Sequence, residues 1–401
     1  MRIHLGVLFT TATVVAQTVH TVGPGGFAQI ADAIAAAAPD DVIEVQAGYY
    51  TPFVLDKALT IRAAPGARVS VLPSGADSVR IMPPAGTVAA LARIEFLNPW
   101  RFFLGYGVRV ERGTAWFEDC VFESPYTYQA AALTVDHSAA VLRGCVIAGF
   151  GVGVSTAGTE NPGLLAEVAT VLATDCIFAG SNTTFDSYGG GGPGIAATTS
   201  DVHLVRCEVY GGDQLHVWGN PAAAGIRSTN SNLWLADCDV EGGASYQTGG
   251  VGVVQGWPVP VRTARTTIAG GPGLNGGTTG AAVQGAVLAA PLLGLDADPT
   301  PLVRGGTFAL AFRTEPNWPV AVVLAPDVGP TTLPELAEPA GVPPATTSLL
   351  ALLVADSSGA APFQTAIPAG PALLGAHLFV TGVAGASLPL QTAPPVGGLV
   401  W

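Results

Sequence analysis

The 401-residue sequence has few charged residues and almost no lysine. Lysine and arginine together number 16 against 29 aspartates and glutamates, Lys57 is the single lysine, and the net charge is −13. Binding to nucleic-acid phosphates depends on clustered lysine and arginine, so the composition argues against a nucleic-acid partner. The acidic residues are scattered along the chain, which is typical of a soluble surface.

Long apolar segments are absent beyond residue 16, because glycine or proline interrupts every later run. The sequence therefore predicts no membrane-spanning helix. The N-terminal segment is different: Met1-Arg2 is followed by an apolar stretch from Leu5 that ends in Val14-Val15-Ala16. This is the pattern of a secretory signal peptide, so we predict cleavage after residue 16 and a secreted or cell-surface protein.

No Cys-x-x-Cys motif or pair of histidines accompanies the cysteines, so we predict no metal site and no cofactor. Glycine and proline are abundant instead, at 52 and 32 residues. With so few charges, this composition favours many short strands joined by tight turns over helices.

The cysteines mark an internal repeat, with intervals of 25, 31, 31 and 31 residues. A glycine or alanine stands thirteen positions before each cysteine. A unit with fixed internal spacing and loops of variable length indicates the coils of a solenoid. The repeated cysteines are Cys120, Cys145, Cys176, Cys207 and Cys238.

The alternation around each cysteine predicts which side chains point inward. Positions −5, −3 and +2 relative to the cysteine are apolar or small in every repeat, as is the cysteine slot itself. We therefore expect the five thiols to stack as an internal ladder, free and buried rather than joined in disulfides. An aspartate, glycine or arginine precedes each cysteine and marks a bend. Aspartate and glycine tolerate a left-handed backbone there, and Arg206 is a mismatch to that pattern.

Residues 22–62 carry a family resemblance. Ile30, Ile34 and several alanines predict a short helix ending at Pro39, followed by strands at 42–45 and 59–62. An Asp-Asp turn, the phrase Val45-Gln-Ala-Gly-Tyr-Tyr and the phrase Asp56-Lys-Ala-Leu-Thr-Ile accompany them. This segment resembles the N-terminal part of the pectin-lyase-like right-handed parallel β-helix superfamily. The resemblance implies an all-β protein with three strands per coil and a helix that covers the first coil.

The repeat fades at both ends, where Ile94 and Thr266 occupy the cysteine slot. The composition then changes at about Pro291. We predict a signal peptide at 1–16, the β-helix at 17–290, a linker at 291–301 and a small antiparallel β-sandwich at 302–401. The last segment resembles the C-terminal β-sandwich modules of large secreted bacterial proteins.

Three consecutive long loops follow the third strand of their coils, at 180–193, 211–221 and 242–250. Stacked coils bring such loops together, and the superfamily resemblance implies a ligand cleft along the first strands beside them. Aromatic and hydrogen-bonding side chains suit sugar rings, so we predict a polysaccharide site there. An alternative is that the aromatic side chains only cover loop backbone. The side chains expected to contact carbohydrate are Phe185, Tyr188, His216, Trp218, Asn220 and Tyr246.

Three functions stay open. The preferred one is a non-catalytic, carbohydrate-binding scaffold. The second is a divergent polysaccharide lyase or glycoside hydrolase acting on acidic polysaccharide, and the third is a structural or adhesive surface protein with no small ligand. Resemblance to the lyases would give Arg227 the role of proton acceptor, and it alone would bring in calcium, held by carboxylates. The catalytic candidates under this alternative are Arg227, His216, Asp213 and Asp186.

The position four residues before each cysteine predicts one more surface. It faces outward on the second strand and is unusually apolar for a position exposed to solvent. Such a stripe is typical of a contact surface, which the C-terminal domain or, in self-association, a second copy of the protein would cover. The stripe consists of Trp116, Val141, Leu172, His203 and Trp234.

Overall fold

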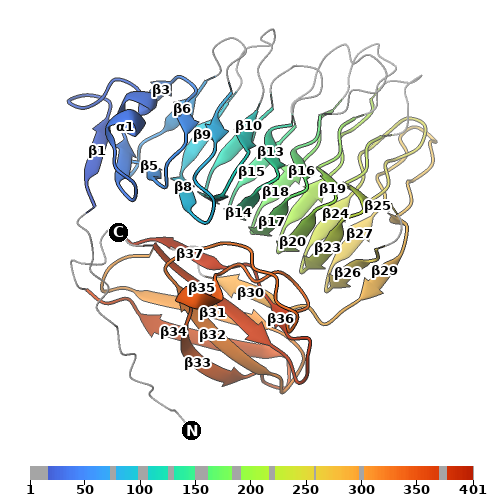
Figure 1. The fold of residues 1–401 in the computed structure, drawn as a ribbon. Helices are drawn as coiled ribbons and strands as arrows, with labels where there is room; N and C mark the ends of the chain where they lie inside the picture. Colours follow the sequence, from blue (N-terminus) through green and yellow to red (C-terminus); the bar gives the residue numbers. More distant parts are fainter. Residues whose placement is uncertain are drawn as a thin grey trace. The chain divides into compact units, whose positions relative to one another are not determined.

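The computed structural model describes residues 17–72, 78–97, 107–124, 131–149, 161–182, 191–215, 222–256, 259–297, 302–369 and 377–400. They form a parallel β-solenoid with three sheets, followed by small antiparallel sheets (Figure 1). The prediction of an all-β fold with three strands per coil is thereby confirmed. The solenoid, Val19–Ala290, is one compact unit, and the chain from Pro291 onward belongs to another. The predicted signal peptide, residues 1–16, lies outside the described residues.

Each full coil contributes one strand to each sheet, and we name the sheets by the order of their strands within a coil. The first-strand sheet contains β4 (Val54–Leu55), β7 (Arg80–Ile81), β10 (Val108–Val110), β13 (Leu133–Asp136), β16 (Leu164–Glu167), β19 (Ile195–Thr198), β22 (Ile226–Thr229), β25 (Val253–Gln255) and β28 (Val283–Gln284).

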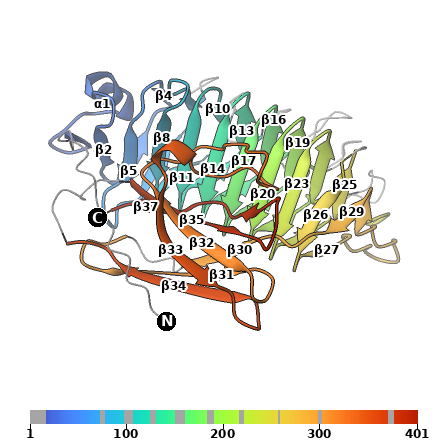
Figure 2. The same cartoon turned by 60° about the horizontal axis from the view of Figure 1, so that its bottom comes forward.

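The second-strand sheet is the longest, with 11 strands, and several of them lie side by side along the axis in Figure 2. It contains β1 (Val19–Val22), β2 (Val42–Val45), β5 (Thr60–Ala63), β8 (Val88–Ala92), β11 (Thr114–Glu118), β14 (Ala139–Arg143), β17 (Thr170–Thr174), β20 (Asp201–Val205), β23 (Asn232–Ala236), β26 (Val261–Ala264) and β29 (Val287–Ala289).

The third-strand sheet completes each coil after a sharp bend. It contains β3 (Gly48–Tyr50), β6 (Val69–Val71), β9 (Ile94–Phe96), β12 (Val121–Glu123), β15 (Val146–Ala148), β18 (Ile177–Ala179), β21 (Glu208–Tyr210), β24 (Asp239–Glu241) and β27 (Thr267–Ala269).

A short helix, α1 (Ile30–Ala36), covers the N-terminal end of the solenoid. Its apolar face is buried against the first coil through Ile30 and Ile34. The single lysine has a structural role here, because Lys57 Nζ donates hydrogen bonds to the carbonyl oxygens of Ile34 (2.7 Å) and Ala37 (2.8 Å). These carbonyls lie at the negative end of the helix dipole, where a cation stabilises the helix. No described helix is long and apolar enough to cross a membrane.

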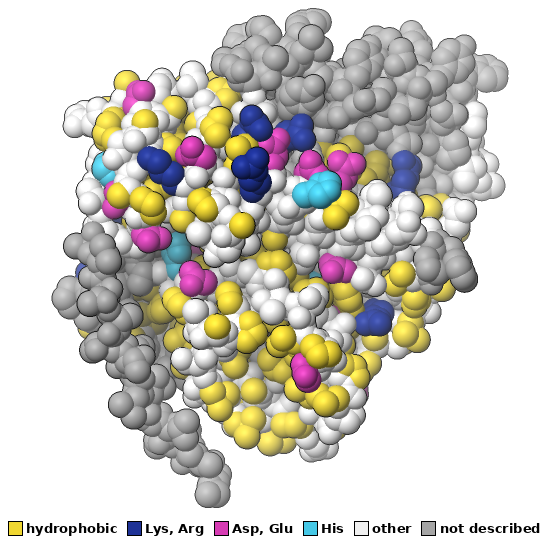
Figure 3. Space-filling model, viewed as in Figure 1, with side chains coloured by type: hydrophobic (Ala, Val, Ile, Leu, Met, Phe, Trp, Pro, Cys, Tyr) yellow, Lys and Arg dark blue, Asp and Glu magenta, His cyan; other side chains and the backbone are white. Residues whose placement is uncertain are grey.

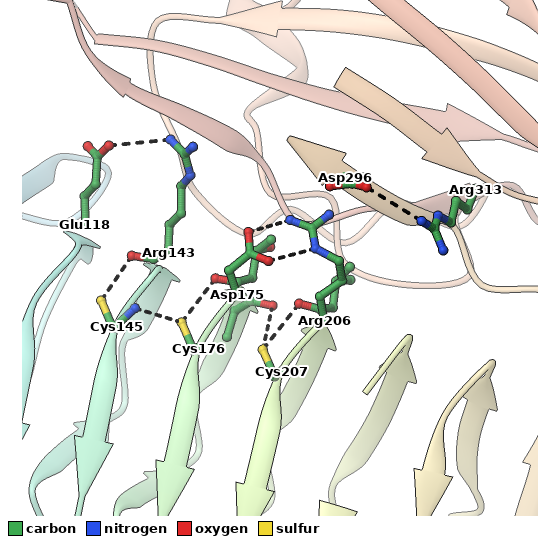
Figure 4. A network of polar contacts seen from close by, with 12 residues as sticks. Glu118, Arg143, Cys145, Asp175, Cys176, Arg206, Cys207, Asp296 and Arg313 are labelled. Atoms are coloured by element: carbon green, nitrogen blue, oxygen red, sulfur yellow. Dashed lines mark hydrogen bonds and ion pairs between the residues drawn. The ribbon is translucent and has the colours of Figure 1, made fainter. Parts of the chain in front are cut away.

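The five cysteines are free and buried inside the solenoid. Each thiol donates to the backbone carbonyl two residues earlier, as Cys176 does to Thr174 at 3.2 Å. The Cys145 amide in turn donates to Cys176 Sγ at 3.4 Å, which links neighbouring coils (Figure 4). Burial raises the pKa of the Cys120 thiol, which keeps it protonated as a donor.

The bend before each cysteine has a left-handed backbone, and the sequence-based doubt about Arg206 was wrong. Arg206 adopts φ 51°, close to the φ of 56° at Asp175 one coil earlier. Its guanidinium pairs with the Asp175 carboxylate, with Nε 2.7 Å from Oδ1 (Figure 4). Arg265 and Asp237 repeat the arrangement at 2.7 and 2.9 Å. The ion pair between coils offsets part of the roughly 1–2 kcal/mol that a left-handed conformation costs a residue with a Cβ.

The C-terminal unit contains two antiparallel sheets whose inward side chains, among them Phe312 and Val322, form one core. Its strand β30 lies inside the segment 291–301 that was predicted as a linker, and Asp296 of β30 pairs with Arg313 at 3.6 Å (Figure 4). The elements are β30 (Gly294–Ala297), β31 (Thr307–Arg313), β32 (Pro319–Ala325), the 3₁₀ helix η1 (Pro344–Thr346), β33 (Ser348–Val354), β34 (Ala360–Ala366), β35 (His377–Ala384), β36 (Gln391–Thr392) and β37 (Val396–Leu399).

Candidate functional site

The outer face of the first-strand sheet carries two columns of polar side chains. Inward residues such as Val108 and Val110 belong to the solenoid core, so Arg109 between them points outward. Pairing of the strands aligns Arg109 with Arg80 in the previous coil. It also aligns Asp136 with Glu167 in the neighbouring coils β13 and β16. Because each coil advances by about 4.8 Å, the columns repeat at that spacing along the axis.

Five of these side chains form one continuous network over β7, β10 and β13. The Arg80 guanidinium lies 2.6 Å from Glu111 Oε2, and Arg109 Nε lies 3.3 Å from Glu111 Oε1. Arg109 also approaches Asp136 in the next coil at 3.8 Å. His137 Nδ1 completes the chain at 2.6 Å from Asp136 Oδ1. Figure 3 shows basic, acidic and histidine side chains gathered on this face.

The network is open to solvent, which bears on its role. The exposed fraction of the side chain is 47% for Arg80, 34% for Arg109, 31% for Asp136 and 71% for His137. Ion pairs this exposed contribute only about 0–1 kcal/mol each to stability. Their geometric effect is larger, because each carboxylate holds an arginine in a defined position over a rigid sheet. Such a surface is suited to recognising a polar ligand by hydrogen bonds.

A third carboxylate continues the acidic column. Glu111, Asp136 and Glu167 each stand nine residues before a cysteine, and threonine occupies this position in the next two coils. Glu167 ends strand β16 and is exposed. This column was not predicted from the sequence, although the signal was present as an acidic residue at the same repeat position in three successive coils.

The long loops leave and re-enter the solenoid through a close-packed glycine neck, which we define as residues 180–182, 191–193, 211–213, 222–224, 242–244, 249–251, 270–272 and 279–281. Outgoing and returning segments alternate along the axis, each joined to the next by a backbone hydrogen bond. For example, Gly212 N donates to Gly192 O and Gly250 N to Gly243 O, both at 2.8 Å. The glycine positions leave no room for a side chain: a Cβ at Gly212 would lie 1.9 Å from the carbonyl oxygen of Ser181. The bases of the loops are therefore rigidly held.

Few of the predicted loop residues lie in the described part of the chain. Phe185, Asp186, Tyr188, His216, Trp218 and Asn220 all lie outside the described residues.

Among the remaining candidates, Asp213 stabilises the loop backbone. Its Oδ1 accepts from the Ala244 amide at 2.7 Å, and its own amide donates to Asn182 Oδ1 at 2.8 Å. Tyr246 follows Ser245, which bridges the neighbouring loops, and is half-buried.

Arg227 is exposed on β22, in the same outward column as Arg109 but four coils further along. The pairing steps run from Arg109 through Thr134, Leu165 and Ala196 to Arg227, so the backbone positions of the two arginines are about 19 Å apart along the axis. No group of three or more His, Cys, Asp or Glu side chains suited to a metal ion occurs within the described residues.

The residues of the apolar stripe lie on the second-strand sheet. They lie outside the solenoid core cluster, as outward-facing positions should. Their exposed fraction is between 0% and 5%, so they do not form an exposed patch. Self-association through Trp116, Val141, Leu172, His203 and Trp234 stays a prediction, and it would require these side chains to become accessible.

No protein-family model matches the sequence, and no curated protein matches it. Two solved structures that match the chain are phage tailspike proteins. Full-length tailspike protein 2 from Escherichia coli O157:H7 bacteriophage CAB120 is 10% identical, with a TM-score of 0.35, over 93% of this chain and 65% of that one. The tailspike protein 2 enzymatically active domain of bacteriophage CBA120 is 12% identical, with a TM-score of 0.28, over 93% of this chain and 73% of that one. Values this low assign neither a family nor a function.

Proposed function

We propose that this protein is an exported, divergent member of the pectin-lyase-like β-helix superfamily that binds an extended polysaccharide along its first-strand sheet. One observation carries the proposal: the unbroken, solvent-accessible network from Arg80 to His137, which crosses three coils of a rigid sheet. Its groups repeat at about 4.8 Å, close to the length that one sugar unit adds to an extended chain. Arginine and carboxylate groups can bind sugar hydroxyls, and arginine can also bind uronate carboxylates bidentately.

The loops would complete the site. Returning segments of the glycine neck lead directly into β19 and β22, so the neck borders the first-strand sheet. We propose that Tyr246, together with Phe185, Tyr188, His216, Trp218 and Asn220, supplies stacking and hydrogen bonds to sugar rings.

Glycan binding by an arginine variant and a matched control would test this proposal. Arg109→Gln removes the shared cation of the network, whereas Arg68→Gln removes an arginine that pairs with Glu95 near the third-strand sheet, on another face. On an array of neutral and acidic polysaccharides, we expect Arg109→Gln to bind at least about tenfold more weakly, which corresponds to 1.4 kcal/mol. Arg68→Gln should bind like the unmodified protein. Equal losses in both variants, or no binding by the unmodified protein, would contradict the proposal.

The loop contribution is tested separately. Trp218→Ala and Tyr246→Ala should each weaken binding without changing thermal unfolding. Unchanged binding in both variants would restrict the site to the sheet. A protein that binds no glycan in any of these assays would instead fit the structural or adhesive function.

The acidic column favours a second candidate function, cleavage of a glycosidic bond. Asp136 and Glu167 occupy equivalent positions in adjacent coils, about 4.8 Å apart along the axis. Retaining glycosidases hold their two carboxyl groups about 5–5.5 Å apart, and the similar spacing of these two backbone positions supports the proposal. One carboxylate would act as nucleophile and the other as general acid and base.

Product assays distinguish the two functions. Incubation with acidic and neutral polysaccharides should release reducing ends if the column is catalytic, and both Asp136→Asn and Glu167→Gln should abolish the release. Glu241→Gln, a change on the third-strand sheet, serves as the control. A lyase using Arg227 would instead form unsaturated products that absorb ultraviolet light, in a reaction that depends on calcium. Binding without either product would leave the non-catalytic function.

A further inference from the structure

The two ends of the solenoid are built differently. Helix α1 covers the N-terminal end, whereas β27, β28 and β29 are the last strands of their sheets at the C-terminal end. Solenoids in general require a polar cap at each end, since an open end presents both core side chains and unpaired backbone groups.

The side chains of this last coil show that its core positions are exposed. Val287 aligns with the fully buried Val261 of the preceding coil, yet its own exposed fraction is 45%. Val283 aligns with the buried Val253 and is only half-buried. The apolar interior of the solenoid therefore continues to its C-terminal end and is accessible there.

The backbone of β29 has one open edge. Ala286 O accepts from Val261 N, and Ala290 N donates to Thr263 O, so residues 286 and 290 face β26. Alternate residues of a parallel strand point their amide and carbonyl groups to opposite sides. The N–H and C=O groups of Val287 and Ala289 therefore point away from the sheet, along the axis.

The end also lacks charge. No charged residue occurs between Thr266 and Leu295, although the chain as a whole carries a net charge of −13. Exposed sheet edges are commonly protected by proline or by charged residues such as lysine. Residues 281–290, which include β29, contain neither. Two copies of this end would meet without electrostatic repulsion, unlike most other parts of so acidic a surface.

We propose that two copies of the protein associate tail to tail through the last coil, residues 267–290. Its 24 residues match the 20–30 residues per partner found in stable interfaces. A two-fold axis across the end would bring β29 of each copy into antiparallel pairing through the open groups of Val287 and Ala289. The helix at the opposite end prevents continued stacking, so the association closes at a dimer.

Sedimentation of the full chain over a range of concentrations tests the dimer. Val287→Lys places a charge in the apolar contact and should weaken dimerisation at least about 100-fold. Val287→Pro removes the outward amide while leaving the hydrogen bonds to β26 intact, and it should also weaken dimerisation. Val287→Thr keeps both the amide and the branched shape, and it should remain dimeric.

The control for added charge is Leu352→Lys, at a leucine that is 71% exposed in the C-terminal unit. It should not alter dimerisation, and thermal unfolding of every variant establishes that it is folded. A monomer at all concentrations would overturn the proposal. So would a dimer that survives both Val287→Lys and Val287→Pro, or one that Leu352→Lys dissociates equally well.

Discussion

His203 is the residue at which burial and ionisation conflict most directly. Its side chain has no exposed surface, and neither ring nitrogen has a hydrogen-bond partner among the described residues. Burial lowers the pKa of the imidazole from 6.5 to about 3, because the charged form would lose its hydration. The folded protein therefore keeps this histidine neutral at a pH where the unfolded chain binds a proton.

The sign of the pH dependence follows from this difference. Between pH 6.5 and 3 the unfolded state binds more protons than the folded state. The contribution of the neutral His203 side chain to the free energy of unfolding is therefore fully present above pH 6.5 and is lost on acidification. At pH 5 the loss amounts to about 2 kcal/mol. We expect His203→Leu to gain stability relative to the unmodified protein as the pH falls from 7.5 to 5, measured by urea unfolding. His137→Asn, which replaces a largely exposed histidine, should show no such gain.

Single residues also show where prediction from sequence stops. The repeat predicted a left-handed bend before each cysteine, and Asp119 and Gly144 both adopt one. Arg206 appeared unsuited to the bend because its own residue type gives no reason for a positive φ. A stabilising partner lies 31 residues away, in the Asp175 carboxylate of the neighbouring coil. A contact between coils is visible in the sequence only after the register of the coils is known.

At the scale of elements, the glycine neck is the feature that could not be predicted from the sequence. The sequence predicts three long loops rich in glycine, and it gives no indication that their bases interlock. Interlocking requires the outgoing segment of one coil to lie between two returning segments, which only the stacked structure provides. The glycines are needed here for close approach of backbone to backbone, at positions without a left-handed φ.

A single added methyl group should therefore disrupt the neck. At Gly250 a Cβ would lie 1.8 Å from the carbonyl oxygen of Ala223, which is backbone and cannot rotate away. We expect Gly250→Ala to lower the free energy of unfolding by about 3 kcal/mol, the upper end of the usual cost of overpacking. In Gly48→Ala the nearest atom would be the Tyr50 hydroxyl at 3.3 Å. That control should change stability by less than about 1 kcal/mol, and equal midpoints of urea unfolding for the two variants would disprove a tightly packed neck.

For the whole molecule, the repeat determined most of the architecture. The cysteine spacing and the alternation around it predicted the strands of each coil, and the helix expected to end at Pro39 is α1. The candidate site was harder to predict, because its network joins residues from three coils and each of them is unremarkable alone. In the sequence, Glu111 is a single acidic residue after a predicted strand. Only the register of the coils shows that Arg80 and Arg109 lie beside it.

The same register predicts that a whole coil can be removed. Deleting residues 176–206 removes 31 residues, joins Asp175 directly to Cys207 and keeps the later coils in phase. Because each coil contacts mainly its neighbours, the shortened protein should still fold and unfold cooperatively. Deleting residues 177–206 leaves one extra residue, which turns Glu208 into the core and Val209 outward. We expect this second protein to lose several kcal/mol or to remain unfolded, as followed by circular dichroism during urea unfolding. Similar unfolding curves for both deletions would mean that stacking of equivalent inward positions does not hold the solenoid together.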